Sequence, residues 1–253
     1  MESEEFIAVT EKGRFRVKIN DDLISVGGKH LCVQIIYRNI SDVELISLET
    51  NKGQCEMNNK KIYNDLTVHI AHLAFTILRK LHPTVHTVNL IDTSSFLCEG
   101  RPMGLMKSSL LLYGKTYYER KFNATPQDES NKIIIEKYRI KWATQPLVPD
   151  FKFDNKDLET ILSPIYKTCN TWKEFMETIH AKFGKQICKY IYPWFIRAVG
   201  DDKITEFWKI DITDKSDIMY KKMGFVGGKR RTIKYSSVYR PAWNGNGIFD
   251  IRY

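Results

Sequence analysis

The side chains that could carry chemistry in this sequence are its cysteines, its histidines and a group of basic residues near its end. The cysteines are irregularly spaced and form no CxxC pair, which argues against a zinc ribbon or a dithiol redox centre. The five are Cys32, Cys55, Cys98, Cys169 and Cys188. An odd number of cysteines in a chain without an export signal predicts reduced thiols that pack as small buried hydrophobes.

Two histidines, His69 and His72, lie three residues apart in a segment with helical periodicity. A zinc site on a helix needs further ligands, and the sequence has neither an HExxH motif nor a carboxylate pair beside these histidines. We therefore interpret both as half-buried helix residues and predict no metal site.

Motifs of several large enzyme classes are absent. The sequence contains no GxxxxGK[ST], no GxGxxG after a strand and no GxSxG. Glycines at those positions allow close approach of the backbone to phosphate or form the sharp turn that exposes a nucleophile. A P-loop nucleotidase, a classical dinucleotide-binding domain and an α/β-hydrolase are therefore disfavoured.

Positive charge is concentrated in the last fifth of the chain. Residues 203–253 contain 11 basic and 5 acidic side chains, a net charge of +6, whereas the first 202 residues contain 28 and 25, a net charge of +3. Residues 219–234 have no acid and carry Lys221, Lys222, Lys229, Arg230, Arg231 and Lys234. Because cations neutralise phosphates and nearby aromatics can stack on bases, this segment is a candidate nucleic-acid-binding region. The alternative is a solvated basic surface.

Length and composition indicate a globular chain. Its 253 residues are 43% hydrophobic, which suits one large domain or a domain with an appendage. With 27% charged and 12% aromatic residues the chain as a whole is not intrinsically disordered. No run approaches the roughly 18 apolar residues of a membrane span, and the acidic start, Met1–Glu5, does not resemble a secretory signal. We expect an intracellular protein that is not secreted.

The first fifty residues predict an antiparallel meander. In Arg14–Ile19 the apolar Phe15, Val17 and Ile19 alternate with basic residues, which places one face on the core and one in water. Turn residues separate this strand from three others. The four predicted strands are Phe6–Val9, Arg14–Ile19, Leu31–Tyr37 and Val43–Thr50.

Helical periodicity follows. Apolar residues recur at helical spacing from Asn64, a suitable N-cap, to Leu81, and Pro83 ends this helix. Val85–Ile91 predicts a buried strand, which after a helical crossover should run parallel to the strand before it. A second helix covers about Leu105–Phe122, so the predicted fold class is α+β.

The remainder is predicted to be helical and then rich in strands. Residues 126–156 contain three prolines and predict a loose connection with a short apolar piece at Ile133–Ile135. A capping box at Thr171–Glu174 begins a helix that ends at Gly184, and residues 186–199 predict another helix, bent or started at Pro193. The last predicted strands are Phe207–Ile212, Thr232–Tyr239 and Ile248–Tyr253.

We therefore divide the chain into three parts. Residues 1–125 form the α+β core, 126–156 the connection, and 157–253 a helical, then β-rich and basic region.

The order of elements from Leu31 to Phe122 is similar to the central half of the GNAT acetyltransferase fold. Within it, Asn89–Phe96 and Leu110–Ala124 resemble GNAT-like proteins of large nucleocytoplasmic DNA viruses. The resemblance implies a V-shaped opening in the sheet that holds acetyl-CoA. It also implies a viral protein of the host cytoplasm or virion, whose partners are viral proteins of the same particle or complex.

A third stretch, Ile218–Phe225, resembles the end of the last GNAT helix, which closes with a Tyr-x-Lys-x-Gly-Phe pattern. A GNAT domain needs only one such helix, so this placement competes with Leu105–Phe122. We favour the earlier placement because its strand and helix lengths fit the family better.

The resemblance also implies site residues. The family binds the pyrophosphate of acetyl-CoA through a glycine-rich loop before its central helix. The corresponding loop here, Gln54–Asn64, has no glycine, so the residues left to bind the cofactor are Lys60, Lys61 and Asn64. A tyrosine on the last helix protonates the leaving thiolate, a role open to Tyr117 or Tyr118, or to Tyr220 in the later placement.

A base for the incoming amine would be Glu44 or Glu49 on the fourth strand. The alternative for all these side chains is structural, as aromatic packing residues and solvent-facing strand residues.

The prediction is thus an acetyltransferase-like protein with a degenerate acetyl-CoA loop, with or without catalysis. Two alternatives stay open. One is a non-enzymatic virion or assembly protein of the minor capsid type, which the loss of the loop glycines favours. The other is a nucleic-acid-binding protein that uses the basic segment near the end of the chain.

Overall fold

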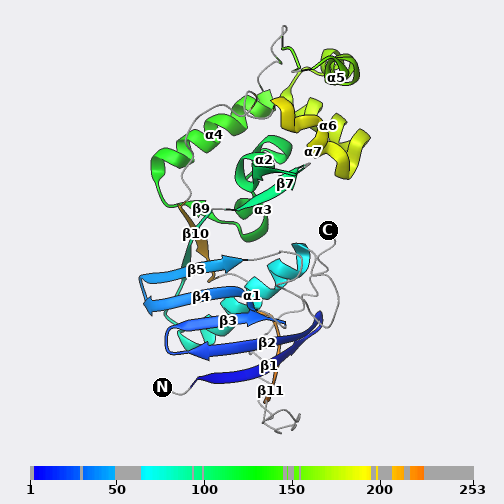
Figure 1. Ribbon diagram of the computed structural model, residues 1–253. Helices are drawn as coiled ribbons and strands as arrows, with labels where there is room; N and C mark the ends of the chain where they lie inside the picture. Colours follow the sequence, from blue (N-terminus) through cyan, green and yellow to red (C-terminus); the bar gives the residue numbers. More distant parts are fainter. Residues whose placement is uncertain are drawn as a thin grey trace, which may run out of the picture.

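Antiparallel strands open the chain. The computed structural model describes residues 3–28, 31–48, 64–92, 94–98, 100–144, 147, 151–153, 155–194, 198, 207–213 and 217–224 (Figure 1). Its first five strands pair in succession, and they are β1 (Glu4–Thr10), β2 (Gly13–Asn20), β3 (Leu23–Gly27), β4 (Leu31–Asn39) and β5 (Asp42–Leu48). Phe15 and Val17 of β2 are fully buried, as the alternation predicts, and they lie on the face that packs on the core.

The third of these strands is missing from the four-strand prediction. Gly27 and Gly28 predict a break in the sequence, but the structure has a strand that ends at Gly27. All of β3 after Leu23 is buried, including the polar Ser25, so burial does not alternate along this strand. A short, continuously buried strand gives no period-2 signal, which explains the omission.

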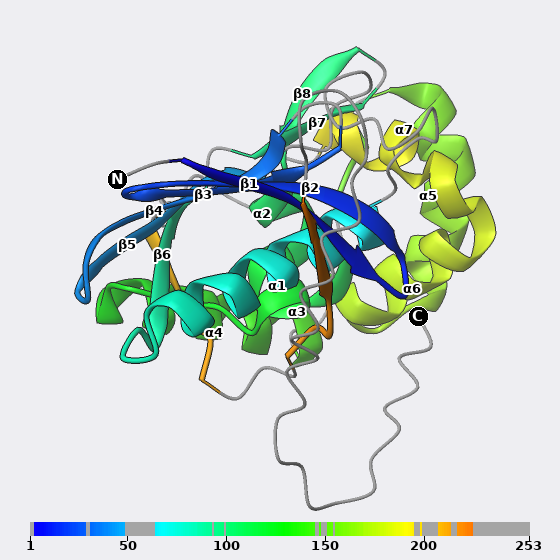
Figure 2. The same cartoon turned by 90° about the horizontal axis from the view of Figure 1, so that it is seen from below.

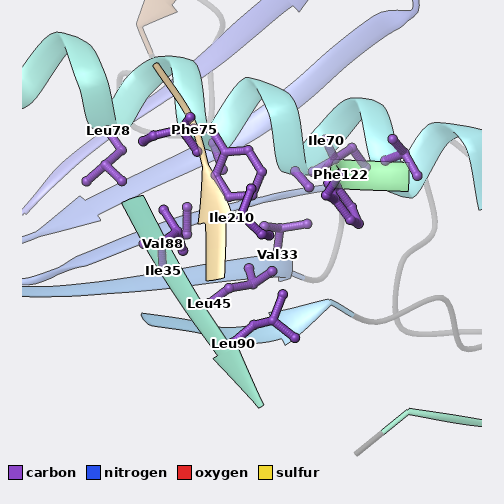
Figure 3. Packing of buried hydrophobic residues seen from close by; sticks show 14 of the residues in the cluster. Val33, Ile35, Leu45, Ile70, Phe75, Leu78, Val88, Leu90, Phe122 and Ile210 are labelled. Atoms are coloured by element: carbon purple, nitrogen blue, oxygen red, sulfur yellow. The ribbon is translucent and has the colours of Figure 1, made fainter. Parts of the chain in front are cut away.

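The helix and strand after the meander confirm the prediction. Helix α1 (Asn64–Leu81) packs on β3 and β4, and β6 (Thr87–Ile91) runs parallel to β5. Figure 2 shows α1 lying along one face of the sheet. In Figure 3, Ile70, Phe75 and Leu78 of α1 point toward the strands, and these side chains are at most 1% exposed.

The single helix predicted for Leu105–Phe122 is wrong, because the structure has two helices there. A β-hairpin precedes them, and the four elements are β7 (Ser95–Cys98), β8 (Arg101–Gly104), α2 (Leu105–Tyr113) and α3 (Tyr117–Phe122). Gly114 ends α2 with a left-handed backbone, φ 66°. Thr116 begins α3 with a capping box, in which its hydroxyl accepts from the Glu119 backbone N–H and its own N–H donates to the Glu119 carboxylate.

The loose connection predicted for residues 126–156 contains a helix, α4 (Glu129–Thr144). Only Asn131 and Ile135 of this helix are buried, whereas Ile133 and Ile140 are 65% and 56% exposed. Without a continuous apolar stripe, α4 lacks the periodicity by which amphipathic helices are recognised in sequences.

Three further helices form a second hydrophobic cluster with the β7–β8 hairpin and α2. They are α5 (Lys156–Thr168), α6 (Trp172–Phe183) and α7 (Ile187–Ile191). The predicted boundaries of α6 are confirmed, since the Thr171 hydroxyl accepts from the Glu174 N–H at 3.2 Å and Gly184 caps the other end. Helix α7 continues into a 3₁₀ turn at Tyr192–Trp194, where Pro193 was predicted to bend or start a helix.

Strands that follow α3 in the chain complete the sheet. They are β9 (Thr125–Pro126), β10 (Phe207–Asp211) and β11 (Lys221–Gly224), and the described sheet has the order β11-β1-β2-β3-β4-β5-β6-β10-β9. The sheet therefore draws on residues beyond 1–125. The placement of a helix end at Ile218–Phe225 is wrong, because β11 pairs there with β1. The strands predicted at Thr232–Tyr239 and Ile248–Tyr253 lie outside the described residues.

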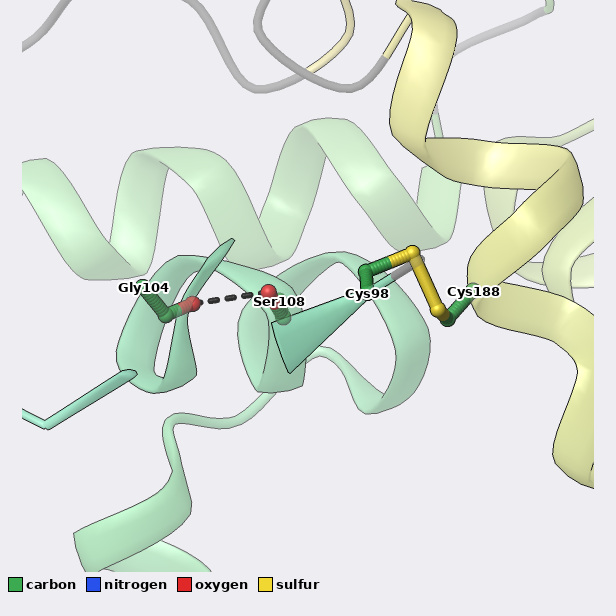
Figure 4. Close-up of a disulfide and its surroundings, with 4 residues drawn as sticks. All are labelled: Cys98, Gly104, Ser108 and Cys188. Carbon is green, nitrogen blue, oxygen red and sulfur yellow. Dashed lines mark hydrogen bonds between the residues drawn. A yellow bond between two sulfur atoms is a disulfide. The ribbon is translucent and has the colours of Figure 1, made fainter. Parts of the chain in front are cut away.

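A disulfide between Cys98 and Cys188 joins the β7–β8 hairpin to α7 (Figure 4). Their Cα atoms are 5.8 Å apart, although 90 residues separate them in the sequence. Cys32 is also disulfide-bonded, whereas Cys169 is free. The prediction of reduced thiols is wrong for these three bonded cysteines, because irregular spacing along a chain carries no information on which cysteines the fold brings together.

Candidate functional site

The sheet opens between β5 and β6. These parallel strands pair only at Glu44–Asn89 and Leu45–Leu90 within the described residues. Immediately beyond, β5 carries a bulge, since Leu45 pairs with Ile35 of β4 but Ser47 pairs with the adjacent Gln34. A bulge bends its strand and increases the local twist, and in the described residues no register pair joins β5 to β6 beyond this point.

A cavity of about 390 Å³ occupies this opening. That volume is in the range of roughly 300–1,000 Å³ found for small-molecule sites. The cavity is lined by Gln34, Leu45, Ile46, Ser47, Leu48, Leu90, Ile91, Ser94 and Tyr118.

The cavity is lined by residues that face opposite sides of the sheet. Neighbouring residues of a strand point to opposite faces, and the adjacent Leu90 and Ile91 both line it. Leu90 is 2% exposed and belongs to the core on the α1 side, whereas Ile91 is 43% exposed on the other side. We call the opening the strand passage, and the face of the sheet opposite α1 the open face.

Tyr118 of α3 contributes the phenol that lines the strand passage. Its side chain is held in the core, where its ring lies 6.2 Å from that of Phe122 in a stacked arrangement. Burial and the nearby charge of Asp92 raise the pKa of Tyr118, and a hydrogen bond with Ser94 opposes them. The hydroxyl therefore keeps its proton at neutral pH. Because the Ser94 hydroxyl donates to Asp92, Tyr118 is the donor in its bond with Ser94, and a ligand can accept that hydrogen bond by replacing Ser94 as the partner.

Asp92 and Ser94 form a polar network behind this hydroxyl. The Ser94 backbone N–H donates to the Asp92 carboxylate at 2.9 Å, and the Ser94 hydroxyl donates to the same oxygen. The Ser94 carbonyl accepts from the N–H of Leu105, the first residue of α2, at 3.0 Å. This bond closes the base of the β7–β8 hairpin, so the hairpin fixes the position of Ser94.

The start of α1 lies at the same edge of the sheet as the strand passage. A crossover helix between parallel strands begins at the edge where those strands end, and α1 begins at Asn64. Phe122 of α3 contacts the N-terminal half of α1, with its ring 5.6 Å from that of His72. The unpaired N–H groups of a helix start attract anions, which places a suitable dipole near the passage.

The residues predicted for catalysis are dispersed. Tyr117 is buried beside Tyr118, with ring centroids 5.4 Å apart, but it does not line the strand passage. Tyr220 lies next to β11, where its ring stacks on Phe6 and where burial raises its pKa. Four strands, β1 to β4, separate β11 from β5 in the sheet. Glu49 lies outside the described residues.

Of the predicted cofactor residues, Asn64 begins α1, and Lys60 and Lys61 lie outside the described residues. The sequence prediction did not include Gln34, Ser47, Asp92 or Ser94. The polar run Asp92–Ser95 directly after a buried strand was the available signal, because polar residues at a strand end often face a site.

The basic segment is described only at its beginning. Lys221 and Lys222 belong to β11 at the edge of the sheet, and the Lys222 ammonium lies 2.6 Å from the Glu4 carboxylate and 4.4 Å from the centre of the Phe6 ring. Binding of nucleic acid through this segment stays a prediction. The remaining cations, Lys229, Arg230, Arg231 and Lys234, lie outside the described residues.

His69 and His72 occupy α1 in the core region. The His69 ring nitrogen Nε2 lies 3.0 Å from the Thr10 hydroxyl, and burial, with the charge of Lys12 and His72, lowers its pKa to about 4. Among the described residues no group of three or more potential metal-binding side chains is found.

Comparisons add no further assignment. No protein-family model, curated protein or solved structure matches the chain. In the part of the chain that the structure describes, no helix is both long and apolar enough to cross a bilayer.

Proposed function

We propose that the protein is an acetyltransferase-like protein that admits the pantetheine arm of acetyl-CoA into the strand passage. The observation that carries this proposal is the separation of β5 and β6 beyond Leu45 and Leu90, with a cavity between them. Strands paired along their whole length would leave no room for the arm. The resemblance in the sequence implies an opening between parallel strands at this point.

The strand order supports the same proposal. A meander leads through α1 to a parallel strand, and β10 then inserts between β6 and β9. Helix α3, which covers the sheet beside α1, brings a tyrosine to the opening, as the resemblance implies for the last helix.

The dimensions and lining of the strand passage fit an acyl thioester. Apolar side chains from both strands suit the methylene groups of the arm, and Gln34, Ser47 and Ser94 offer hydrogen-bonding groups for its amides. In this proposal the pyrophosphate lies near the start of α1, where Lys60, Lys61 and the N–H groups that begin with Asn64 would hold it in place of a glycine loop.

Acetyl transfer requires an amine nitrogen to form a bond with the thioester carbonyl carbon while the carbon–sulfur bond breaks. The sulfur leaves as a thiolate, and the amine loses a proton. The Tyr118 hydroxyl donates a hydrogen bond to the sulfur and keeps its proton. This hydrogen bond stabilises the developing negative charge. Glu44 or Glu49 accepts the amine proton, and Glu44 belongs to β5 two residues before the bulge.

Calorimetric titration with acetyl-CoA tests the proposal. We expect binding by the natural chain, binding at least about 10-fold weaker in Ile46→Trp because the indole fills the passage, and unchanged binding in Ile40→Trp. Ile40 is a matched control, since it is 54% exposed in the turn between β4 and β5. Absence of heat up to millimolar acetyl-CoA, or equal binding by Ile46→Trp, would contradict the proposal.

Tyr118→Phe separates binding from catalysis. It removes one hydroxyl, so acetyl-CoA should still bind while turnover falls by about 10²-fold. Binding without measurable turnover in the natural chain would support the non-catalytic form of the same proposal.

A further inference from the structure

The strand passage opens on the open face between exposed apolar side chains. Phe207 of β10 is the register partner of Ile91 of β6, and Ile91 lines the cavity opposite Ile46 of β5. These three side chains form a row across three strands, which we call the apolar row. Their exposed fractions are 44% for Ile46, 43% for Ile91 and 51% for Phe207.

A row of this kind differs from ordinary surface hydrophobics. Single exposed apolar residues are common and need no explanation. Here Ile91 and Phe207 are register partners, and Ile46 and Ile91 line the cavity from neighbouring strands. Apolar residues grouped at the mouth of a site indicate a ligand with a complementary apolar part.

A polar row lies beside the apolar row on the same face. Glu44 pairs with Asn89, and Asn89 pairs with Lys209, so these side chains cross the same three strands two residues away from the apolar row. Arg38 lies 3.7 Å from the Glu44 carboxylate, and Gln127 donates to the Asn89 side chain at 3.0 Å. The row therefore holds one carboxylate between two cations.

The charges of the polar row decide between two classes of amine. A polyamine would meet Arg38 and Lys209 as well as Glu44, and it would gain nothing from the apolar row. A monoamine with an aliphatic or aromatic chain could place its chain on Ile91 and Phe207 and its nitrogen at the passage.

We propose that the apolar row binds the acyl acceptor and selects a primary monoamine with an apolar chain about the size of a leucine or phenylalanine side chain. This inference rests on the proposed function. Acetyl-CoA, the acyl donor, would enter from the α1 side. The acceptor amine would lie on the open face with its nitrogen directed at the thioester carbon.

Saturation-transfer NMR on the full chain tests the inference with phenethylamine and spermidine as probes. We expect phenethylamine to bind and spermidine to show no transfer. In Phe207→Ser the Kd for phenethylamine should rise by about 10-fold, because the largest apolar contact is lost. Phe207→Leu keeps an apolar side chain and should stay within about 3-fold of the natural chain.

Leu97→Ser is the matched control, because Leu97 is 73% exposed but lies on β7 outside the apolar row. It should leave phenethylamine binding unchanged. If Phe207→Ser does not fold, as judged by its thermal transition, Ile91→Ser replaces it with the same expected change.

Preferential binding of spermidine, or equal loss of phenethylamine in Leu97→Ser and Phe207→Ser, would overturn the inference. The acetyl-CoA titration is run separately on the same samples. Phenethylamine binding to the apolar row without acetyl-CoA binding would overturn the proposed function and leave the amine site standing. Acetyl-CoA binding without phenethylamine binding would overturn the inference and leave the proposed function standing.

Discussion

Tyr118 shows how a single side chain can be prepared for a role by its surroundings. Burial and the Asp92 charge both disfavour its ionised form, whereas Ser94 stabilises that form through a hydrogen bond. Burial and Asp92 raise the pKa and Ser94 lowers it, so substitutions of Asp92 and Ser94 test two of these influences separately. A phenol with a raised pKa serves better as a hydrogen-bond donor than as a proton donor, because it keeps its proton through the reaction.

Two substitutions should move the pKa of Tyr118 in opposite directions. Asp92→Asn removes a negative charge and should lower this pKa, whereas Ser94→Ala removes a stabilising hydrogen bond and should raise it. Carbon-13 NMR of tyrosine labelled at Cζ, titrated from neutral to alkaline pH, measures both changes. Shifts of the same sign in the two variants would show that the network has been assigned incorrectly.

His69 makes the stability of the fold depend on pH. Its pKa is about 4 in the folded state, mainly through burial, against 6.5 as the ordinary value. Between these values the unfolded chain binds a proton that the folded chain does not, so the free energy of unfolding falls as the pH falls. The stabilisation is complete above about pH 6.5 and is lost progressively toward pH 4.

We therefore expect the free energy of unfolding to fall by about 2 kcal/mol between pH 7 and pH 5 through this one group. Urea unfolding at the two pH values gives the difference. His69→Gln cannot take up the proton, so its free energy of unfolding should fall by about 2 kcal/mol less between pH 7 and pH 5. The prediction fails if the natural chain and His69→Gln have parallel pH profiles.

At the scale of elements, the junction of α2 and α3 is fixed by local chemistry and by one tertiary contact. Gly114 has φ 66°, and a Cβ at this position would lie 2.6 Å from the Trp142 ring of α4. The indole N–H of Trp142 donates to the Leu111 carbonyl at 2.8 Å, which restrains the ring from moving aside. The left-handed backbone and the close contact both require glycine here.

Gly114→Ala should accordingly destabilise the fold by about 2–4 kcal/mol. Two other glycines separate the effect of the left-handed backbone from that of the contact with Trp142. Gly100 has φ 79°, and no atom lies within 4 Å of the position that a Cβ would take, so Gly100→Ala should cost only about 1 kcal/mol. Gly104 has an ordinary φ and open space, so Gly104→Ala should be nearly neutral. Thermal or urea unfolding of the three variants ranks them, and an equal effect of all three would refute the role of Trp142.

The elements also show why some boundaries were predictable. Helix α6 carries its cap at Thr171, its stop at Gly184 and an apolar face between them, so local chemistry and packing agree. Helix α4 has only two buried residues, Asn131 and Ile135, and β3 is buried without alternation. Neither shows the periodicity that a sequence can display.

At the scale of the whole molecule, a disulfide joins distant parts of the chain within the second hydrophobic cluster. The Cys98–Cys188 disulfide ties the hairpin that follows the strand passage to α7, across 90 residues of sequence. Closing so long a loop restricts the unfolded chain considerably, and the chain-entropy estimate for such a loop is above 4 kcal/mol.

The double variant Cys98→Ser/Cys188→Ser should be less stable by about 2–4 kcal/mol, the range usual for native disulfides. Unfolding in urea without reductant measures the difference, and reductant should remove most of it. Cys169→Ser is the control, because Cys169 is free and partly exposed. Equal stability of the double variant and the natural chain would mean that the disulfide does not raise the free energy of unfolding.

The sequence by itself determined the local parts of this protein. Alternation in Arg14–Ile19 predicts β2, helical spacing predicts α1, and the crossover rule predicts that β6 lies parallel to β5. Each of these depends on residues close together in the chain or on a handedness that all chains share.

Only the tertiary structure decided the site. Tyr117 and Tyr118 are adjacent and identical in type, and the packing of α3 on the sheet determines that Tyr118 reaches the strand passage. The insertion of β10 beside β6 likewise joins Phe207 to Ile91, 116 residues apart in sequence. Such proximities arise from the packing of whole elements, because no local propensity in a chain encodes which distant segment will become its neighbour.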